Sequence, residues 1–370
     1  MSAKWYETEH AAQIDSPALL IYPDRAKDNI DKALKMAGGP ERLRPHVKTN
    51  KAVQACQMMM EAGITRFKCA TIAEAEMLVM AGAKDILLAY QPVGPKIERL
   101  AKLIQSQPAV KFRCLIDHID AAKQISRKMA ENDLMIQVYI DLNAGTNRTG
   151  ISPGAPAEQL YHQAGKLRGI SVAGFHLYDG HLRNPDINLR RQECDEGFRP
   201  IASMWAKLEE EENTSLEMIA GGTTTFPIHA QRNRVTCSPG TFIYWDKGYG
   251  DVLPEQPFLP AALVMSRVIS LPTPGLICLD LGHKSIASEN PIEKRVTFLN
   301  APDLKPVSQS EEHLVMDAGE GHDFKIGDVL YGVPYHVCPT VALHDRATVI
   351  KGGKIAEEWR IISRDRKINF

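Results

Sequence analysis

The chain has 370 residues, of which 44% are hydrophobic and 24% are charged, and its formal net charge is -1. A chain of this length can bury a sizeable core, either as one large barrel or as two domains. The near-neutral charge lacks the broad basic surface that attracts nucleic acid or an acidic membrane. We therefore expect a globular protein with neither of these partners.

Two further features of the sequence indicate the cellular compartment. The first ten residues lack the apolar stretch of a secretory signal, and no apolar run approaches the roughly 18 residues of a membrane span. The seven cysteines are odd in number and contain no CxxC pair. Scattered thiols of this kind fit a reducing compartment better than a disulfide framework. The sequence thus predicts a cytoplasmic protein.

Residues 17–248 alternate short apolar runs with helical patterns. Strands are expected at 17–22, 44–48, 67–70, 86–90, 111–117, 135–142, 170–178, 215–220 and 235–244, and the clearest helices at 24–37, 51–62, 72–81 and 186–212. Repeated strand–helix units indicate a parallel sheet with right-handed crossovers. About eight such units predict a closed α/β barrel of the (β/α)8 TIM type.

The alternation of predicted strands and helices stops after about residue 254. Strand-like runs at 261–270, 275–286, 313–318, 329–337 and 348–362 follow one another with short turns between them. The run Lys351-Gly352-Gly353-Lys354 is typical of a hairpin turn. We expect a smaller C-terminal all-β domain made of residues 254–370, with residues 1–16 packed onto it.

Lys48 ends the first helix-flanked strand of the predicted barrel. Barrel enzymes gather their catalytic groups at the C-terminal ends of the strands. A lysine held there can form a Schiff base with an aldehyde. The alternative interpretation is an ordinary surface lysine ahead of a helix.

Two glycine- and threonine-containing loops follow the last two predicted barrel strands. One contains Gly222 and Thr223, and the other contains Gly240 and Thr241. Glycine lets backbone amides approach an anion closely, and threonine adds a hydroxyl donor. Either loop alone could be a plain turn. Together, at the recurrent phosphate position of such barrels, they predict a phosphorylated ligand.

Two other strands end in polar side chains. Residues 141–150 carry Arg148 to the same rim, and the next strand ends with His176, Tyr178 and His181. Buried polar groups of this kind can be satisfied core residues instead of catalysts. Their shared position at strand ends favours the functional interpretation.

Near the C-terminus, His336 and Cys338 stand two residues apart. If the segment is a strand, the two side chains point to the same face. An imidazole and a thiolate suit a soft divalent ion such as zinc, and two protein ligands leave positions open for substrate. The alternative is a pair of unrelated core residues.

Taken together, these motifs resemble the fold-type III pyridoxal-phosphate enzymes, of which alanine racemase is the best-known member. The runs Pro-His-Val-Lys-Thr-Asn-Lys and His-x-Cys-Pro-Thr are closer to the D-serine dehydratase and D-threonine aldolase family. The resemblance covers nearly the whole chain. It implies a barrel that holds pyridoxal 5'-phosphate, a C-terminal β-domain, a divalent metal beside the cofactor, and a homodimer.

The resemblance also assigns roles. Lys48 would bind the cofactor covalently, Arg148 would bind its phenolic oxygen and Tyr178 would lie against its ring. The phosphate would be bound by four residues of the two loops, Gly222, Thr223, Gly240 and Thr241. The metal would be bound by His336 and Cys338. Zinc is favoured as the metal, with manganese and magnesium as alternatives.

The expected reaction is that of a lyase on β-hydroxy-D-amino acids. Alanine racemases usually have an arginine where this chain has Ser238, which argues against racemization. The His-x-Cys pair resembles the dehydratases, whereas well-known D-threonine aldolases resemble His-x-Asp. Elimination to a keto acid and ammonia is therefore favoured, with aldol cleavage to glycine and an aldehyde as the alternative. A racemase, a non-catalytic cofactor carrier and a barrel without the cofactor are more distant readings.

Overall fold

A computed structural model describes residues 4–369 of the chain. These residues form two compact units. One, here called the barrel unit, contains residues 32–48, 54–240 and 365–369. The other, here called the β-unit, contains residues 4–31, 49–53 and 241–364.

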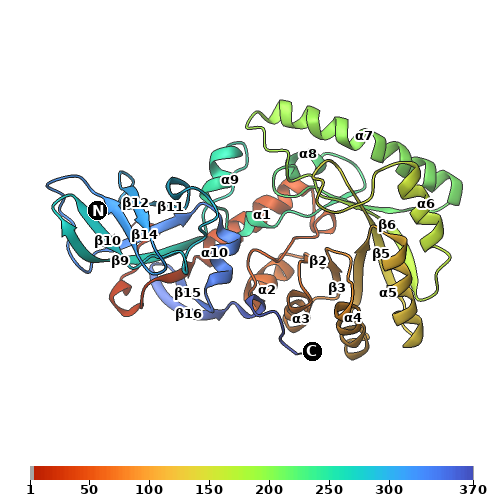
Figure 1. Ribbon diagram of the computed structural model, residues 1–370, viewed down its shortest axis with the longest axis horizontal. Coiled ribbons are helices and arrows are strands. Elements are labelled where there is room, and N and C mark those ends of the chain that lie inside the picture. The colour runs from red at the N-terminus through yellow and green to blue at the C-terminus, as the bar shows by residue number, and fades with distance from the viewer. Residues whose placement is uncertain (1–3, 370) are drawn as a thin grey trace. The chain divides into compact units, whose positions relative to one another are not determined.

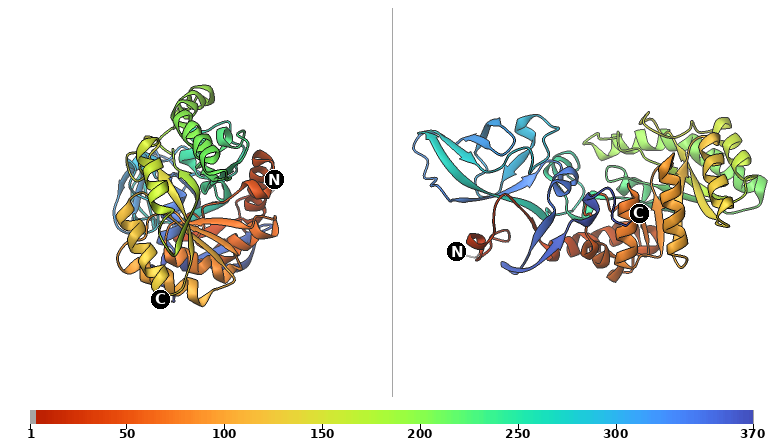
Figure 2. Two further views of the ribbon diagram at one scale, coloured as in Figure 1. Left: turned by 90° about the vertical axis from the view of Figure 1, so that its right-hand side faces the viewer. Right: turned by 60° about the horizontal axis from the view of Figure 1, so that its bottom comes forward.

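The barrel unit is built on a parallel sheet of seven strands in the order β2-β3-β4-β5-β6-β7-β8 (Figure 1). The strands are β2 Arg66–Cys69, β3 Asp85–Leu88, β4 Lys111–Ile116, β5 Ile136–Leu142, β6 Ile170–Leu177, β7 Glu217–Ala220 and β8 Val235–Cys237. The helices are α2 Val53–Glu61, α3 Ile72–Ala81, α4 Pro95–Ser106, α5 Ile119–Glu131, α6 Ala155–Ala164, α7 Ile187–Glu212 and α8 Phe226–His229. Helices α3 to α6 lie outside the strands that they follow (Figure 2).

An irregular segment closes this sheet. His46 forms a parallel bridge with Lys68 of β2, and Leu43 forms one with Cys237 of β8. The amide of Val47 donates to the carbonyl oxygen of Lys68 at 2.9 Å. Residues 43–47 therefore stand where a strand between β8 and β2 would stand, and Pro45, which has no amide hydrogen, prevents a regular ladder there. The prediction of a TIM-type barrel is confirmed.

The ends of this barrel differ in chemistry. The starts of the strands carry an ionic network in which Arg44 contacts Asp85 at 2.6 Å and Arg113 contacts Glu217 at 3.1 Å. Tyr139 donates a hydrogen bond to Glu217 at 2.8 Å. These groups stabilise the N-terminal end of the barrel, so the opposite end, where the strands lead into loops, is the one available for chemistry.

The β-unit contains a nine-stranded, mostly antiparallel sheet in the order β12-β13-β10-β9-β1-β15-β16, with β14 pairing to β9 and β11. Its strands are β1 Ala18–Ile21, β9 Ala262–Thr273, β10 Leu276–Leu279, β11 Val296–Phe298, β12 Lys305–Gln309, β13 Leu314–Asp317, β14 Val329–Pro334, β15 Arg346–Lys351 and β16 Lys354–Arg360. Its helices are α9 Lys247–Val252 and α10 Val337–Leu343, and α1 Pro23–Ala37 spans the boundary between the units. Short 3-10 helices lie at Ala11–Gln13, Pro40–Arg42, Thr241–Ile243, Ile292–Lys294 and Ile362–Arg364.

The strands expected at 17–22 and at 235–244 differ from their predictions. The strand predicted at 17–22 forms as β1, but it pairs with β9 and β15 instead of following the barrel rhythm. The strand predicted at 235–244 stops at Cys237, because Pro239 and Gly240 interrupt it and a 3-10 helix begins at Thr241. The hairpin turn predicted at 351–354 is confirmed, with positive φ at both central glycines.

The core of the β-unit includes residues from the start of the chain. Tyr6 and Ile14 belong to the same buried cluster as Leu20, Leu263 and Tyr331. Among residues 4–369, no helix is both long and apolar enough to cross a membrane.

Candidate active site

Lys48 directly follows the segment that closes the barrel. The segment is held on its β8 side by Ser238, whose hydroxyl donates to the carbonyl oxygen of Arg44 at 2.8 Å. On its β2 side, the amide of Lys68 donates to the carbonyl oxygen of Pro45, also at 2.8 Å. Lys48 itself is partly exposed, as a group that must reach a ligand needs to be.

A second lysine lies inside the barrel, on the strand that pairs with the segment before Lys48. Lys68 of β2 is only 3% exposed, and its Nζ lies 3.3 Å from Nε2 of His176 on β6. The other ring nitrogen of His176 lies 2.7 Å from a carboxylate oxygen of Asp141 on β5. A carboxylate only accepts, so Nδ1 of His176 carries the hydrogen and Nε2 accepts from Lys68.

The electrostatics of this chain of groups follow from burial. Burial, and after it the charge of Lys48, lowers the pKa of Lys68 to about 7. Burial and the neighbouring lysine also lower the pKa of His176. Burial raises the pKa of Asp141, but its hydrogen bond with His176 and other contacts outweigh that effect and lower it. Near neutral pH the three groups are an amine in protonation equilibrium, a neutral imidazole and a carboxylate.

Three of the predicted cofactor residues meet at the ends of β5, β6 and β7. The guanidinium of Arg148 lies over the ring of Tyr178, 4.9 Å from its centre. A Cβ added to Gly222 would come within 2.7 Å of Cε2 of Tyr178, so only glycine lets this ring approach the loop. The sequence prediction that these residues share one rim agrees with this geometry.

The two predicted phosphate loops also meet. The amide of Gly240 lies 3.5 Å from the hydroxyl of Thr223, at the limit of a hydrogen bond. The buried Oγ1 of Thr224 has no hydrogen-bond partner among residues 4–369. A buried hydroxyl without a partner is costly, and an anion seated against this loop would satisfy it. These residues fit the phosphate of a phosphorylated cofactor.

The predicted metal pair has a different local structure from the one expected. Strand β14 ends at Pro334, His336 is the N-cap of α10 and Cys338 is the second residue of that helix. The expectation of a strand is therefore wrong, because Pro339 suits the first turn of a helix and has no amide for a sheet ladder. The two side chains nevertheless interact with each other.

The surroundings of this pair fit a metal site. Nδ1 of His336 is hydrogen-bonded to a carboxylate oxygen of Glu289, an arrangement that orients metal-binding histidines and leaves Nε2 for the ion. The hydroxyls of Thr49 and Thr241 lie 3.1 and 3.8 Å from the sulfur of Cys338. Burial opposes the charge on His336, but contacts with Cys338 and Glu289 outweigh it and raise the pKa of the ring to about 9. The donor set, one nitrogen and one sulfur, suits zinc.

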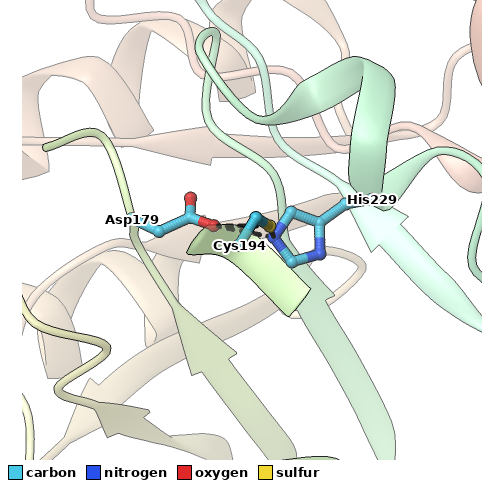
Figure 3. Close-up of side chains that lie close together, drawn as sticks. All are labelled: Asp179, Cys194 and His229. Atoms are coloured by element: carbon cyan, nitrogen blue, oxygen red, sulfur yellow. Dashed lines mark hydrogen bonds and ion pairs between the residues drawn. The ribbon is translucent and has the colours of Figure 1, made fainter. Parts of the chain in front are cut away.

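A second group of ligand-type side chains lies in the barrel unit (Figure 3). Asp179, Cys194 and His229 are buried, and one ligand atom from each lies within 4.8 Å of the others. Nε2 of His229 lies 2.7 Å from Asp179 and 3.4 Å from the sulfur of Cys194. These distances alone would allow a metal ion.

The hydrogen bonds of this group favour a polar network over a metal centre. Arg232 contacts Nδ1 of His229 and also lies 3.6 Å from the sulfur of Cys194. Arginine only donates, so Nδ1 is an acceptor and Nε2 carries the hydrogen that Asp179 accepts. Burial raises the pKa of Cys194 to about 12, which keeps the thiol protonated. Thr225 also donates to Asp179, so the network anchors the phosphate loop to the end of β6.

Several side chains near the candidate residues were not predicted from the sequence. They are Lys68 and Asp141 of the barrel unit and Glu289 and Thr49 of the β-unit. A signal existed for one of them: in the buried run Phe67-Lys68-Cys69, alternation places the lysine on the barrel interior while its neighbours face outward. The others become neighbours only through contacts between distant segments.

Comparisons with known proteins agree with this architecture. The family model described as "Alanine racemase, N-terminal domain" matches residues 21–247, and the one described as "Putative serine dehydratase domain" matches residues 261–350. The chain therefore belongs to the family that carries the alanine racemase N-terminal domain, the fold-type III pyridoxal-phosphate enzymes.

Individual relatives are similar over nearly their whole length. The chain is 29% identical to a D-threonine aldolase from Arthrobacter sp. over 95% of this chain and 93% of the relative. It is 24% identical to a 3-hydroxy-D-aspartate aldolase from Paracoccus denitrificans (strain Pd 1222), with the same two coverages. The crystal structure of a D-threonine aldolase from Filomicrobium marinum matches with a TM-score of 0.87 and 26% identity, covering 96% of each chain.

Proposed function

We propose that this protein is a pyridoxal-phosphate- and divalent-metal-dependent lyase that acts on β-hydroxy-D-amino acids. The single observation that carries the proposal is the barrel rim, where Lys48 follows the segment that pairs with Lys68, and Lys68 in turn contacts His176 and Asp141 in series. Arg148, Tyr178 and the two phosphate loops line the ends of other strands of the same barrel. The full-length similarity to aldolases of β-hydroxy-D-amino acids supports the substrate class.

When bound, pyridoxal phosphate supplies a conjugated ring that accepts the electron pair of a bond broken at the α-carbon of an amino acid. The chain's own residues do the rest. Lys48 would hold the cofactor through its aldehyde carbon. The loops at Thr223 and Gly240, together with Thr241, hold the phosphate. Arg148 would hold the phenolic oxygen, and Tyr178 would limit where the ring can lie.

The second part of the proposal concerns the β-hydroxyl. His336 and Cys338 would hold the metal, with Glu289 fixing the histidine ring. A divalent ion there acts as a Lewis acid on an oxygen ligand, which either weakens the carbon–oxygen bond or stabilises the alkoxide left on that oxygen. We favour zinc, with manganese and magnesium as alternatives.

Two reactions fit these groups, and each has an observation in its favour. The full-length aldolase relatives favour cleavage between the α- and β-carbons, which yields glycine and an aldehyde. The cysteine at position 338 and the match to the serine dehydratase domain favour elimination, which yields a 2-keto acid and ammonia. We rank aldol cleavage first and elimination second. The serine at position 238, which donates to a backbone carbonyl, leaves racemization a more distant alternative.

The experiment is product analysis by mass spectrometry. The purified protein is loaded with pyridoxal phosphate and incubated with D-threonine, D-serine and D-threo-3-hydroxyaspartate, each with zinc or manganese. The L-enantiomers and a Lys48→Ala variant serve as controls. Glycine with an aldehyde identifies cleavage, and a keto acid with ammonia identifies elimination. Neither product from any D-substrate, or equal turnover of both enantiomers, would contradict the proposal.

Two further parts of the proposal concern the oligomeric state and the cellular location. We expect a homodimer, as in the family that the sequence resembles, and a cytoplasmic enzyme. Sedimentation equilibrium tests the first, because a monomer at micromolar concentration would contradict it.

A further inference from the structure

Resting on the proposed function, we propose that Lys68 is the proton acceptor for Lys48. It would take the proton that Lys48 must lose each time it forms a bond to the cofactor's aldehyde. His176 and Asp141 would hold Lys68 in place for this task. Lys68 acts on the chemistry through Lys48 and is in this sense a positioning and proton-transfer residue.

The chemical need comes from lysine itself. A protonated ammonium has no lone pair and cannot bond to a carbonyl carbon. In the first step one N–H bond of Lys48 breaks, one forms on the Lys68 amine, and the positive charge moves with the proton. The nitrogen of Lys48 then bonds to the aldehyde carbon, and the aldehyde oxygen leaves as water with the two hydrogens remaining on that nitrogen.

The structure places Lys68 on the strand that pairs with the segment leading to Lys48. The closing segment and β2 are held together by backbone hydrogen bonds on both sides of Lys68, at 2.8 and 2.9 Å. The Lys68 side chain is buried, and its Nζ reaches Nε2 of His176 at 3.3 Å. Because Nε2 accepts, the lone pair of a neutral Lys68 amine is left for a donor other than His176.

The protonation state of Lys68 supports this role. An ordinary lysine is almost fully protonated at neutral pH and is a poor acceptor. The lowered pKa of about 7 makes about half of the Lys68 side chains neutral there. Two cations, Lys48 and Arg44, favour the neutral amine of Lys68. Two carboxylates, Asp141 and Asp179, favour its charged form. The ring of His176 is hydrogen-bonded to it.

The test measures cofactor loading, which does not depend on turnover. Protein stripped of cofactor is mixed with pyridoxal phosphate from about pH 6 to about pH 10, and the absorbance of protein-bound cofactor gives the loading rate. The wild-type rate should rise with a midpoint near the Lys68 pKa of about 7. In Lys68→Met and Lys68→Arg, loading at pH about 7 should be roughly 100-fold slower, a typical effect of removing an acid–base group. Rates should converge with the wild type near pH 10, with unchanged final stoichiometry.

The arginine variant separates two roles. Arginine keeps the positive charge but cannot give up its proton. If Lys68→Arg loads like the wild type at pH about 7, the charge of Lys68 matters and its proton does not, and the proposal is overturned. A normal rate in Lys68→Met, or loss of loading at every pH with the fold retained, overturns it as well.

Asp141→Asn supplies a second test if the Lys68 variants do not fold. The carboxylate of Asp141 favours the charged form of Lys68, so its removal should move the loading midpoint to lower pH. An unchanged midpoint, or one at higher pH, would contradict the proposal. The outcome is independent of the lyase assignment: normal loading behaviour without products would overturn the proposed function and leave this inference standing.

Discussion

Replacement of Lys68 by methionine should stabilise the cofactor-free protein at and below neutral pH. In the folded state the pKa of this lysine falls from its ordinary 10.5 to about 7. One pKa unit corresponds to about 1.4 kcal/mol, so the fold bears a cost of about 5 kcal/mol for this group at low pH. Methionine has a similar length, fills the same space and carries no charge. Loss of the hydrogen bond to His176 offsets about 1 kcal/mol.

The sign of the pH dependence follows from proton binding. Between pH 7 and 10.5 the unfolded chain binds more protons at this position than the folded one, so the stability of the wild type rises with pH across this window. The advantage of Lys68→Met should therefore be about 4 kcal/mol at or below pH 7. It should disappear as the pH approaches 10.5.

The assay is urea unfolding of the cofactor-free protein at about pH 6 and about pH 10, followed by circular dichroism. Lys166→Met is the matched control, because Lys166 is exposed and its substitution should change stability by less than about 0.5 kcal/mol at both pH values. Equal stability of Lys68→Met and the wild type at pH 6 would refute the reasoning. So would a stability difference that is the same at both pH values.

The other predictions concern the metal and the cofactor loops. His336→Ala should retain the cofactor but lose bound zinc and turnover, whereas Cys194→Ser should keep its zinc. Elemental analysis measures the zinc, and the cofactor absorbance measures the cofactor. Zinc loss only in the Cys194 variant would assign the metal to the Asp179–Cys194–His229 group instead. Glu289→Gln should weaken zinc binding by about 10- to 100-fold in a competition titration with a chelator, and an unchanged affinity would remove the carboxylate from the site. Gly222→Ala should weaken pyridoxal-phosphate binding, because the new methyl would come within 2.7 Å of a tyrosine ring. Gly197→Ala, where a Cβ meets no atom within 4 Å, is its control, and equal affinities in the two variants would contradict the expectation.

The barrel was predictable because its signals are local. Apolar runs of four to eight residues followed by helical patterns place β2 to β7 within a few residues of their observed bounds, and α3 at Ile72–Ala81 begins and ends where expected. Glycine at position 82 ends that helix in a left-handed conformation, as a helix-terminating glycine does. Periodicity and turn chemistry do not depend on distant contacts, so they can be read from the sequence.

The partners of a segment were less predictable. The run at 18–21 has the pattern of a buried strand in either a barrel or a sandwich, and only tertiary pairing with β9 and β15 decides between them. The local structure at His336 was equally hard to predict. The sequence shows that His336 and Cys338 are two residues apart, but not that His336 caps a helix. Glu289 is 47 positions away from that histidine and becomes its partner only through folding.

The residues of the candidate site also differ in how well the sequence predicts them. Lys48, Arg148 and Tyr178 could be proposed because each follows an apolar run that the sequence marks as a strand. Lys68 and Asp141 lie within strands that are otherwise largely buried, so they looked like parts of ordinary buried runs. Their role depends on which face of a closed barrel they occupy, and that face is fixed only when the strands are in register.

The most direct measurement of the central claim is to locate the lysine that binds the cofactor. The protein is loaded with pyridoxal phosphate, reduced with borohydride to make the attachment permanent, digested and sequenced by mass spectrometry. We predict one pyridoxyl group per chain, on Lys48. Attachment to Lys68 or to any other lysine instead, or no attachment, would contradict this account of the site.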